Sequence, residues 1–129
     1  MTARQPVQTP HAPAAIGPYS QAIVAAGLVH CSGQIAIDPE TQELVGADAP
    51  AQAERALANL KAVLEAAGSG LDRVVKCNVY LASMADFAAV NEVYGRYFGG
   101  ESPPARACIE AAGLPKGALF EVDCVALVG

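Results

Sequence analysis

In the segment SPPARACIE, residues 102–110, two prolines precede a short run of small and apolar residues that contains Arg106. The chain has only eight basic residues, so an arginine at this position needs an explanation. A guanidinium group is a planar fork of N–H donors that binds a carboxylate through two parallel hydrogen bonds. An ion pair or a capped carbonyl at a subunit interface is the structural alternative. This segment alone leaves both roles open.

A second candidate group lies in the segment LFEVDCVALV, residues 119–128. Glu121 and Asp123 alternate with apolar residues, so both carboxylates point to one face of a predicted strand. A carboxylate placed beside a reacting bond can take a proton from water and return it to a leaving group. We interpret Asp123 as an interface or solvated carboxylate. Coupling between the two acids, which would raise one pKa, is the alternative.

Two amphipathic helices are predicted from apolar residues at helical spacing. The first begins at the N-cap residue Asp48 and ends at Gly68. The second runs from Ser83, which forms a possible capping box with Asp86, to about Phe98. The core face of the first helix is predicted to consist of Ala53, Ala56, Leu57, Leu60, Val63, Leu64 and Ala67.

Five β-rich runs are predicted to be strands, and the first two form a hairpin around Gly27. The Pro-rich first fifteen residues are expected to lie loosely along the surface. The order of elements predicts one α+β domain over residues 1–129, with two helices packed against one sheet. The predicted strands are residues 21–27, 28–37, 73–82, 105–112 and 119–128.

Strand alternation predicts which residues the helices leave uncovered. In the last strand, one face is wholly apolar and suits the helices, whereas the other is half charged. In residues 105–112, we place Arg106, Cys108 and Glu110 on the half-charged face and the residues between them toward the helices. Such a face predicts cover by other subunits, with Arg106 and Glu121 lining a cleft between chains. The wholly apolar set is Phe120, Val122, Cys124, Ala126 and Val128.

The composition argues against several classes of protein. The net charge is −5 and no cluster of lysines or arginines occurs, so we expect no nucleic-acid partner. No segment approaches the roughly 20 apolar residues of a membrane span, and no signal peptide is visible, so we expect a cytoplasmic protein that binds no membrane. Four scattered cysteines and the isolated His11 and His30 predict reduced thiols and no metal site.

Five segments, taken together, resemble the reactive intermediate deaminase family, also called YjgF-like or RidA-like. The resemblance extends from about Pro13 to the C-terminus with order and spacing preserved. It implies a chorismate-mutase-like fold of the Bacillus type, with a mixed sheet and two helices on one face. It also implies a homotrimer with a barrel-like centre and sites at the subunit interfaces. The segments are AIGPYSQA, CSGQIAIDP, ERALANLKAVLEAAG, VNEVYGRYF and PPARACIEAAGLPKGALFEV.

The resemblance implies a cofactor-free enzyme that hydrolyses 2-imino acids, or 2-aminoacrylate-type enamines, to 2-oxo acids and ammonia. The family's arginine matches Arg106, which would hold the substrate carboxylate, and its acidic residue matches Glu121, which would move protons. Positions that place substrate and water match Tyr19, Ser32, Gly33, Asn91 and the backbone of Cys108.

Each of those placements has a structural alternative. Tyr19 would be a turn aromatic, Ser32 would satisfy a backbone group at a strand end, and Asn91 would join its helix to a loop. A rival function is a module that binds small carboxylates such as 2-oxo acids, which would use Arg106 without Glu121 as a base. Nuclease, translation-inhibitor and chaperone-like roles are further alternatives, and the acidic charge disfavours the first two.

Overall fold

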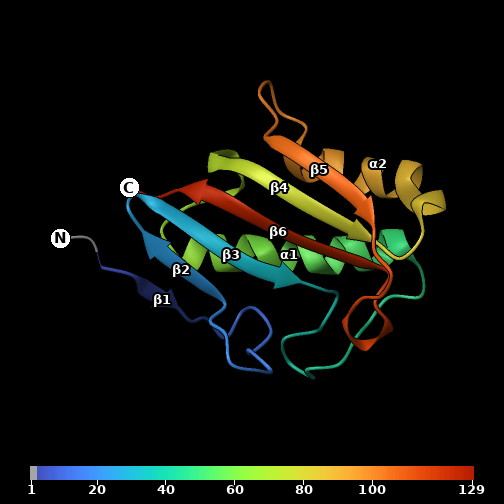
Figure 1. Ribbon diagram of the computed structural model, residues 1–129, viewed down its shortest axis with the longest axis horizontal. Helices are drawn as coiled ribbons and strands as arrows, with labels where there is room; N and C mark the ends of the chain where they lie inside the picture. The colour runs from blue at the N-terminus through green and yellow to red at the C-terminus, as the bar shows by residue number, and fades with distance from the viewer. Residues whose placement is uncertain (1–2) are drawn as a thin grey trace.

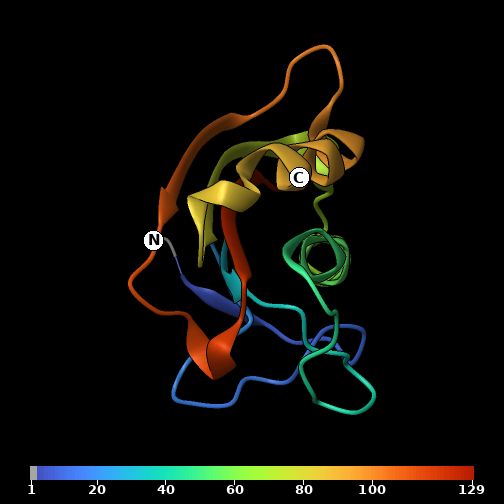
Figure 2. The same cartoon turned by 90° about the vertical axis from the view of Figure 1, so that its right-hand side faces the viewer.

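The computed structural model describes residues 3–129. A six-stranded sheet has the order β1-β2-β3-β6-β4-β5, in which only β4 and β5 are parallel neighbours. Both helices, α1 (Ala49–Ala66) and α2 (Phe87–Phe98), cover the same face of the sheet (Figures 1 and 2). This confirms the expected α+β architecture with a mixed sheet and two helices. The strands are β1 (Gln5–Val7), β2 (Ala22–Ala25), β3 (Leu28–Gln34), β4 (Val74–Leu81), β5 (Ala105–Glu110) and β6 (Phe120–Leu127).

Helix α1 begins and ends where the sequence predicts. Asp48 Oδ1 accepts a hydrogen bond from the N–H of Ala51 at 2.9 Å, which satisfies one of the free donors of the first turn. After the helix, Gly68 adopts a φ of +79°, a left-handed conformation that suits glycine. The predicted core face is buried at every position except Ala67, which is half-buried and packs against the core.

Helix α2 begins later than predicted. A short 3₁₀ turn, η2 (Met84–Asp86), precedes it, so the α-helix proper starts at Phe87. The Ser83 hydroxyl accepts from the N–H of Ala85 at 3.3 Å instead of completing a capping box with Asp86. Ser83 therefore caps the 3₁₀ turn rather than the α-helix.

The N-terminal segment is not loose, which corrects the sequence prediction for the residues that the structure describes. Strand β1 pairs with β2 at the edge of the sheet, and Thr9 and Ala12 are buried. The side chain of Gln21, only 1% exposed, accepts from the N–H of Thr9 at 2.7 Å and donates to the carbonyls of Thr9, Ala12 and Pro13. A buried amide thus ties this segment to the sheet. Residues 1 and 2 lie outside the described residues.

The open face is the side of the sheet opposite the helices, and it carries the alternate residues of β6, including Glu121 and Asp123. The apolar set predicted for the helix side is buried from Phe120 to Ala126, and Val128 is half-buried. The large apolar side chains of Ile109 and Leu127 are 52% and 44% exposed.

Among residues 3–129, no helix is long and apolar enough to cross a membrane.

Candidate functional site

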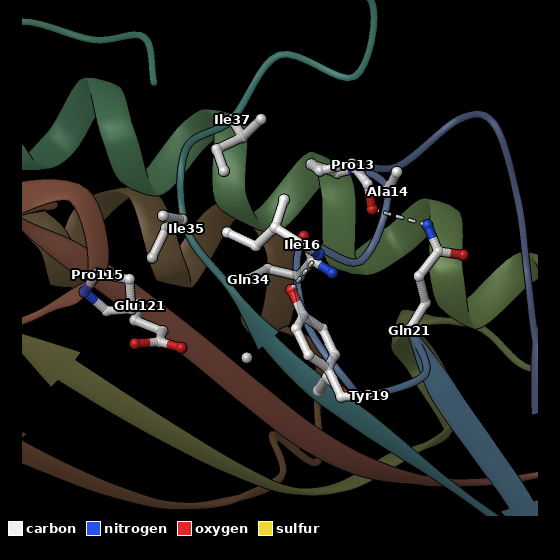
Figure 3. A pocket seen from close by; sticks show the side chains of 12 residues that line it. Pro13, Ala14, Ile16, Tyr19, Gln21, Gln34, Ile35, Ile37, Pro115 and Glu121 are labelled. Atoms are coloured by element: carbon white, nitrogen blue, oxygen red, sulfur yellow. Dashed lines mark hydrogen bonds between the residues drawn. The ribbon is translucent and has the colours of Figure 1, made fainter. Parts of the chain in front are cut away.

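A pocket of about 380 Å³ lies between the N-terminal segment, β3 and the start of β6. Figure 3 shows Glu121 and Pro115 on one side of it and Tyr19 and Ile16 on the other. Tyr19, Ser32, Gly33 and Glu121, four of the predicted site residues, line this pocket together. The full lining is Pro13, Ala14, Ile16, Tyr19, Gln21, Ser32, Gly33, Gln34, Ile35, Ile37, Pro115 and Glu121.

The carboxylate of Glu121 lies directly over Gly33. The pairing of β3 with β6 shifts register between Cys31 and Gln34, so a bulge contains Ser32 and Gly33. A methyl group added at Gly33 would collide with Oε2 of Glu121. Only a residue without a side chain therefore allows the carboxylate to occupy this place.

The environment of Glu121 makes its carboxyl group hold a proton more readily than a free one. Burial raises the pKa of Glu121 above its ordinary value of 4.5, and the negative charge of Asp123 raises it further. A carboxyl group with a raised pKa at the wall of a pocket is suited to general acid–base chemistry.

Ser32 and Tyr19 are both held by local hydrogen bonds. The Ser32 hydroxyl donates to the carbonyl of Ser20 at 2.6 Å, so it satisfies a backbone group as the structural alternative foresees. The hydroxyl of Tyr19 accepts from the N–H of Ile16 at 3.4 Å, and the residue, which lines the pocket, is 48% exposed. Their roles in placing substrate or water remain predictions.

Arg106 lies on the helix side of the sheet, which corrects the predicted face of β5. Its Nη1 donates to Oδ1 of Asn91 on α2 at 2.7 Å. Its Cζ lies 4.7 Å from the ring centroid of Tyr94 and 5.5 Å from that of Phe87, within cation–π range. The parallel register places Arg106 beside Cys77, which is buried under the helices. Paired residues share a face, so Arg106 points the same way.

The same register turns the neighbours of Arg106 toward the helices. Cys108 pairs with the buried Val79, and Glu110 pairs with the buried Leu81. The exposed Ile109, which alternates with them, must therefore lie on the open face. The sequence prediction is wrong here, because it placed Cys108 and Glu110 on the open face and Ile109 toward the helices.

Within one chain, Arg106 and Glu121 are far apart. Arg106, Cys77 and Cys124 form one row across β5, β4 and β6, and Glu121 lies three residues along β6 from that row. Two strand spacings and three residues give a Cα separation of about 14 Å, with the side chains on opposite faces. The predicted site residues thus form two separate sets, which we call half-sites: Glu121 with the pocket, and Arg106 with Asn91.

The thiol of Cys108 has no sign of activation. It is half-buried against the core, and burial raises its pKa although the Arg106 charge opposes the shift. Burial also raises the pKa of Cys77 to about 11. Thiols with a raised pKa are poor nucleophiles at neutral pH, because little thiolate is present. Among residues 3–129, no three His, Cys, Asp or Glu side chains gather in a way that could hold a metal ion.

Sequence reasoning missed the two aromatic rings that hold Arg106. It predicted an amphipathic helix over this segment without relating Phe87 or Tyr94 to the arginine. A signal was present, because Phe87, Asn91 and Tyr94 occur at i, i+4 and i+7 and so share one helix face. The role of Gln21 in fixing the pocket wall had no comparable signal.

The structure is thus a small α+β protein with a carboxylate at the wall of a pocket and an arginine on the edge strand of the sheet. Residues 9–128 match the model of the family described as Endoribonuclease L-PSP. The chain belongs to this family, which is the YjgF/RidA family that its motifs resemble.

Individual relatives are similar over nearly the whole chain. A RutC family protein of Synechocystis is 51% identical, with 95% of each chain covered. The mouse protein named 2-iminobutanoate/2-iminopropanoate deaminase is 45% identical over 98% of this chain and 93% of its own. The crystal structure of E. coli TdcF with bound serine superposes on this chain with a TM-score of 0.91 at 37% sequence identity. The superposition covers 97% of this chain and 99% of the TdcF chain.

Proposed function

We propose that this protein hydrolyses 2-imino acids, and the 2-aminoacrylate-type enamines that tautomerise to them, to 2-oxo acids and ammonia without a cofactor. The observation that carries the proposal is the half-buried Glu121 carboxylate over Gly33, with its pKa raised, at the wall of a pocket. The name of the mouse relative, a deaminase for 2-iminobutanoate and 2-iminopropanoate, supports the same reaction.

In this reaction Glu121 would move the protons. Its carboxylate takes a proton from water while the water oxygen bonds to the C=N carbon of the protonated imine, giving a carbinolamine. The carboxyl group then protonates the amine nitrogen. The C–N bond breaks as the hydroxyl group loses its proton to Glu121, and ammonia leaves with the 2-oxo acid as product. The carboxylate then returns to its starting form when the second proton passes to ammonia.

Arg106 would hold the substrate carboxylate. One of its five N–H donors is committed to Asn91, which leaves a fork of donors for a bidentate pair. The rings of Phe87 and Tyr94 restrict the guanidinium to one place. A carboxylate bound in a fixed orientation presents the adjacent C=N carbon in one position, which lowers the entropic cost of reaction.

The separation of Arg106 from Glu121 requires a second chain. We propose a homotrimer in which the Glu121 half-site of one subunit meets the Arg106 half-site of its neighbour. Association through the open face would also bury Ile109 and Leu127, whose large apolar side chains are 52% and 44% exposed in one chain.

A carboxylate-binding module is the second candidate. The serine bound in the crystal structure of TdcF is a small amino acid, which favours a site of this family that binds small carboxylates. Such a module would depend on Arg106 but not on Glu121. We do not propose ribonuclease activity, despite the family's description, because a net charge of −5 repels a polyanion.

The test measures ammonia and 2-oxo acid release while an amino acid oxidase generates 2-iminopropanoate or 2-iminobutanoate. Wild type should exceed spontaneous hydrolysis. Arg106→Ala and Glu121→Gln should each lower kcat/KM by about 100-fold or more, because one removes the carboxylate clamp and the other the proton carrier. The controls Arg96→Ala and Glu65→Gln change exposed charges of α2 and α1 and should retain activity, although Arg96→Ala also breaks the exposed ion pair with Glu54.

Two results would contradict this proposal, the first for the reaction and the second for the role of Glu121. If the wild-type protein leaves imine hydrolysis at the spontaneous rate but binds 2-oxobutanoate through Arg106, the binding module is established instead. If Glu121→Gln keeps full activity, Glu121 is not the proton carrier.

A further inference from the structure

A polar cluster on the open face has no role in the hydrolysis as described so far. It joins Asp123 on β6 to Asn78 and Tyr80 on β4. Asn78 Nδ2 donates to Oδ1 of Asp123 at 2.8 Å, and the Tyr80 hydroxyl donates to Oδ2 at 2.8 Å. All three side chains are half-buried. Each oxygen of the carboxylate therefore has its own donor, which fixes the orientation of the group.

The cluster places a fixed negative charge beside Glu121. In the β4–β6 register, Asn78 is opposite Asp123 and Tyr80 is opposite Glu121. Glu121 and Asp123 are alternate residues of one strand, so their side chains share the open face about 6.6 Å apart along the chain. Asn78 and Tyr80 are neutral donors, so they orient the Asp123 carboxylate without cancelling its charge.

Other charged groups of the neighbouring strands lie farther from Glu121. His30 on β3 and Lys76 on β4 both pair with the residue two positions beyond Asp123, about 13 Å along β6 from Glu121. Lys116, in the turn before β6, is exposed and is not among the residues that line the pocket. In the described chain, Asp123 is thus the charged group on these strands closest to Glu121.

We propose that Asp123 is a positioning residue of the hydrolysis, whose fixed charge beside Glu121 shifts upward the pH range in which Glu121 exchanges protons with water and ammonia. The inference rests on the proposed function, because it concerns the proton carrier of that reaction. Burial is the larger cause of the raised pKa of Glu121, and the Asp123 charge adds to it, because repulsion between two carboxylates disfavours the second charge.

The experiment compares the pH dependence of kcat and kcat/KM for wild type and Asp123→Asn. Glu121 must be ionised to take a proton from water, so the rate falls on the acid side as Glu121 becomes protonated. Asp123→Asn removes the charge and keeps the side-chain shape. Glu121 then releases its proton more easily, so the acid limb should move to lower pH while the plateau falls by less than about tenfold.

Tyr80→Phe is the matched control for the hydrogen bonds of the cluster. It removes one donor but keeps the ring and the charge of Asp123, so its acid limb should not move to lower pH. If the cluster were only structural, both variants would lose activity and thermal stability in parallel, with the acid limb unmoved. That result would overturn the proposal.

A titration that needs no turnover separates this inference from the function. Carbon-13 NMR of the Glu121 carboxyl group in the intact protein should show a lower midpoint in Asp123→Asn than in wild type. An active wild type whose acid limb and titration midpoint are both unchanged by Asp123→Asn overturns this inference alone. A wild type that does not accelerate imine hydrolysis overturns the proposed function and, with it, any role of Asp123 in the reaction.

Discussion

Gly33 determines where the carboxylate of Glu121 lies. Its φ is not in the left-handed region, so an alanine fits the backbone, but the added methyl would meet Oε2 of Glu121. The end of a glutamate side chain is flexible, so the carboxylate would move away rather than the strand unfold.

Gly33→Ala should therefore separate activity from stability. We predict a loss in kcat/KM of roughly tenfold to 100-fold, because a displacement near 1 Å misplaces the proton carrier. The free energy of unfolding should change by less than about 1 kcal/mol. Steady-state kinetics and denaturant unfolding measure the two effects.

Gly95→Ala is the control for adding a methyl group. Gly95 lies within α2, and nothing lies within 4 Å of the added methyl. The Gly95→Ala variant should retain activity and gain about 0.5–1 kcal/mol in stability, because alanine has a higher helix propensity than glycine. Full activity of Gly33→Ala would show that the position of Glu121 over Gly33 is not needed.

At the scale of the elements, Asn59 joins α1 to the segment that follows β3. Its buried Nδ2 donates to the carbonyls of Ile35 and Ile37 at 3.3 and 2.8 Å, and its Oδ1 accepts from Arg55. Ile35 and Ile37 form part of the pocket wall. One side chain thus supports both the helix–sheet packing and the site.

Asn59→Ala should destabilise the protein by roughly 1–3 kcal/mol, because it leaves the buried carbonyl of Ile37 without a donor. The carbonyl of Ile35 keeps the N–H of Ile37 as its donor. Denaturant unfolding measures the change. Glu65→Ala, an exposed substitution on the same helix, should cost less than about 0.5 kcal/mol. A cost below about 1 kcal/mol for Asn59→Ala would mean that water replaces the lost donors.

The sequence was sufficient to predict the elements with strong periodicity. Helix α1 follows from its N-cap Asp48 and its apolar spacing, and the buried side of β6 follows from strict alternation. Both signals arise from local geometry, which the chain carries in its own order of residues.

The face of β5 could not be predicted in the same way. Alternation shows that Arg106, Cys108 and Glu110 share a face, but not which face it is. Five of the six residues of this edge strand are exposed, so burial gives little guidance. The answer depends on the parallel register with β4, which is a long-range pairing. The bonds of Gln21 to the N-terminal segment are long-range as well.

At the scale of the whole molecule, the composition and the open face both favour association. Hydrophobic residues make up 53% of the chain and charged residues only 16%, which is apolar for a chain of 129 residues. Arg106 and Glu121 lie on opposite faces, so the proposed reaction needs association to bring both groups to one substrate. The central claim is therefore a site shared between subunits.

Complementation between two inactive variants tests this claim most directly. Arg106→Ala and Glu121→Gln chains, co-expressed in equal amounts, would assemble into mixed oligomers. A shared site that draws its two groups independently from the two kinds of chain is complete about one time in four. We predict that the mixture recovers about a quarter of the wild-type rate of imine hydrolysis, while each variant alone stays near the spontaneous rate. A mixture as inactive as its parents, in oligomers shown to contain both chains, would contradict the shared site.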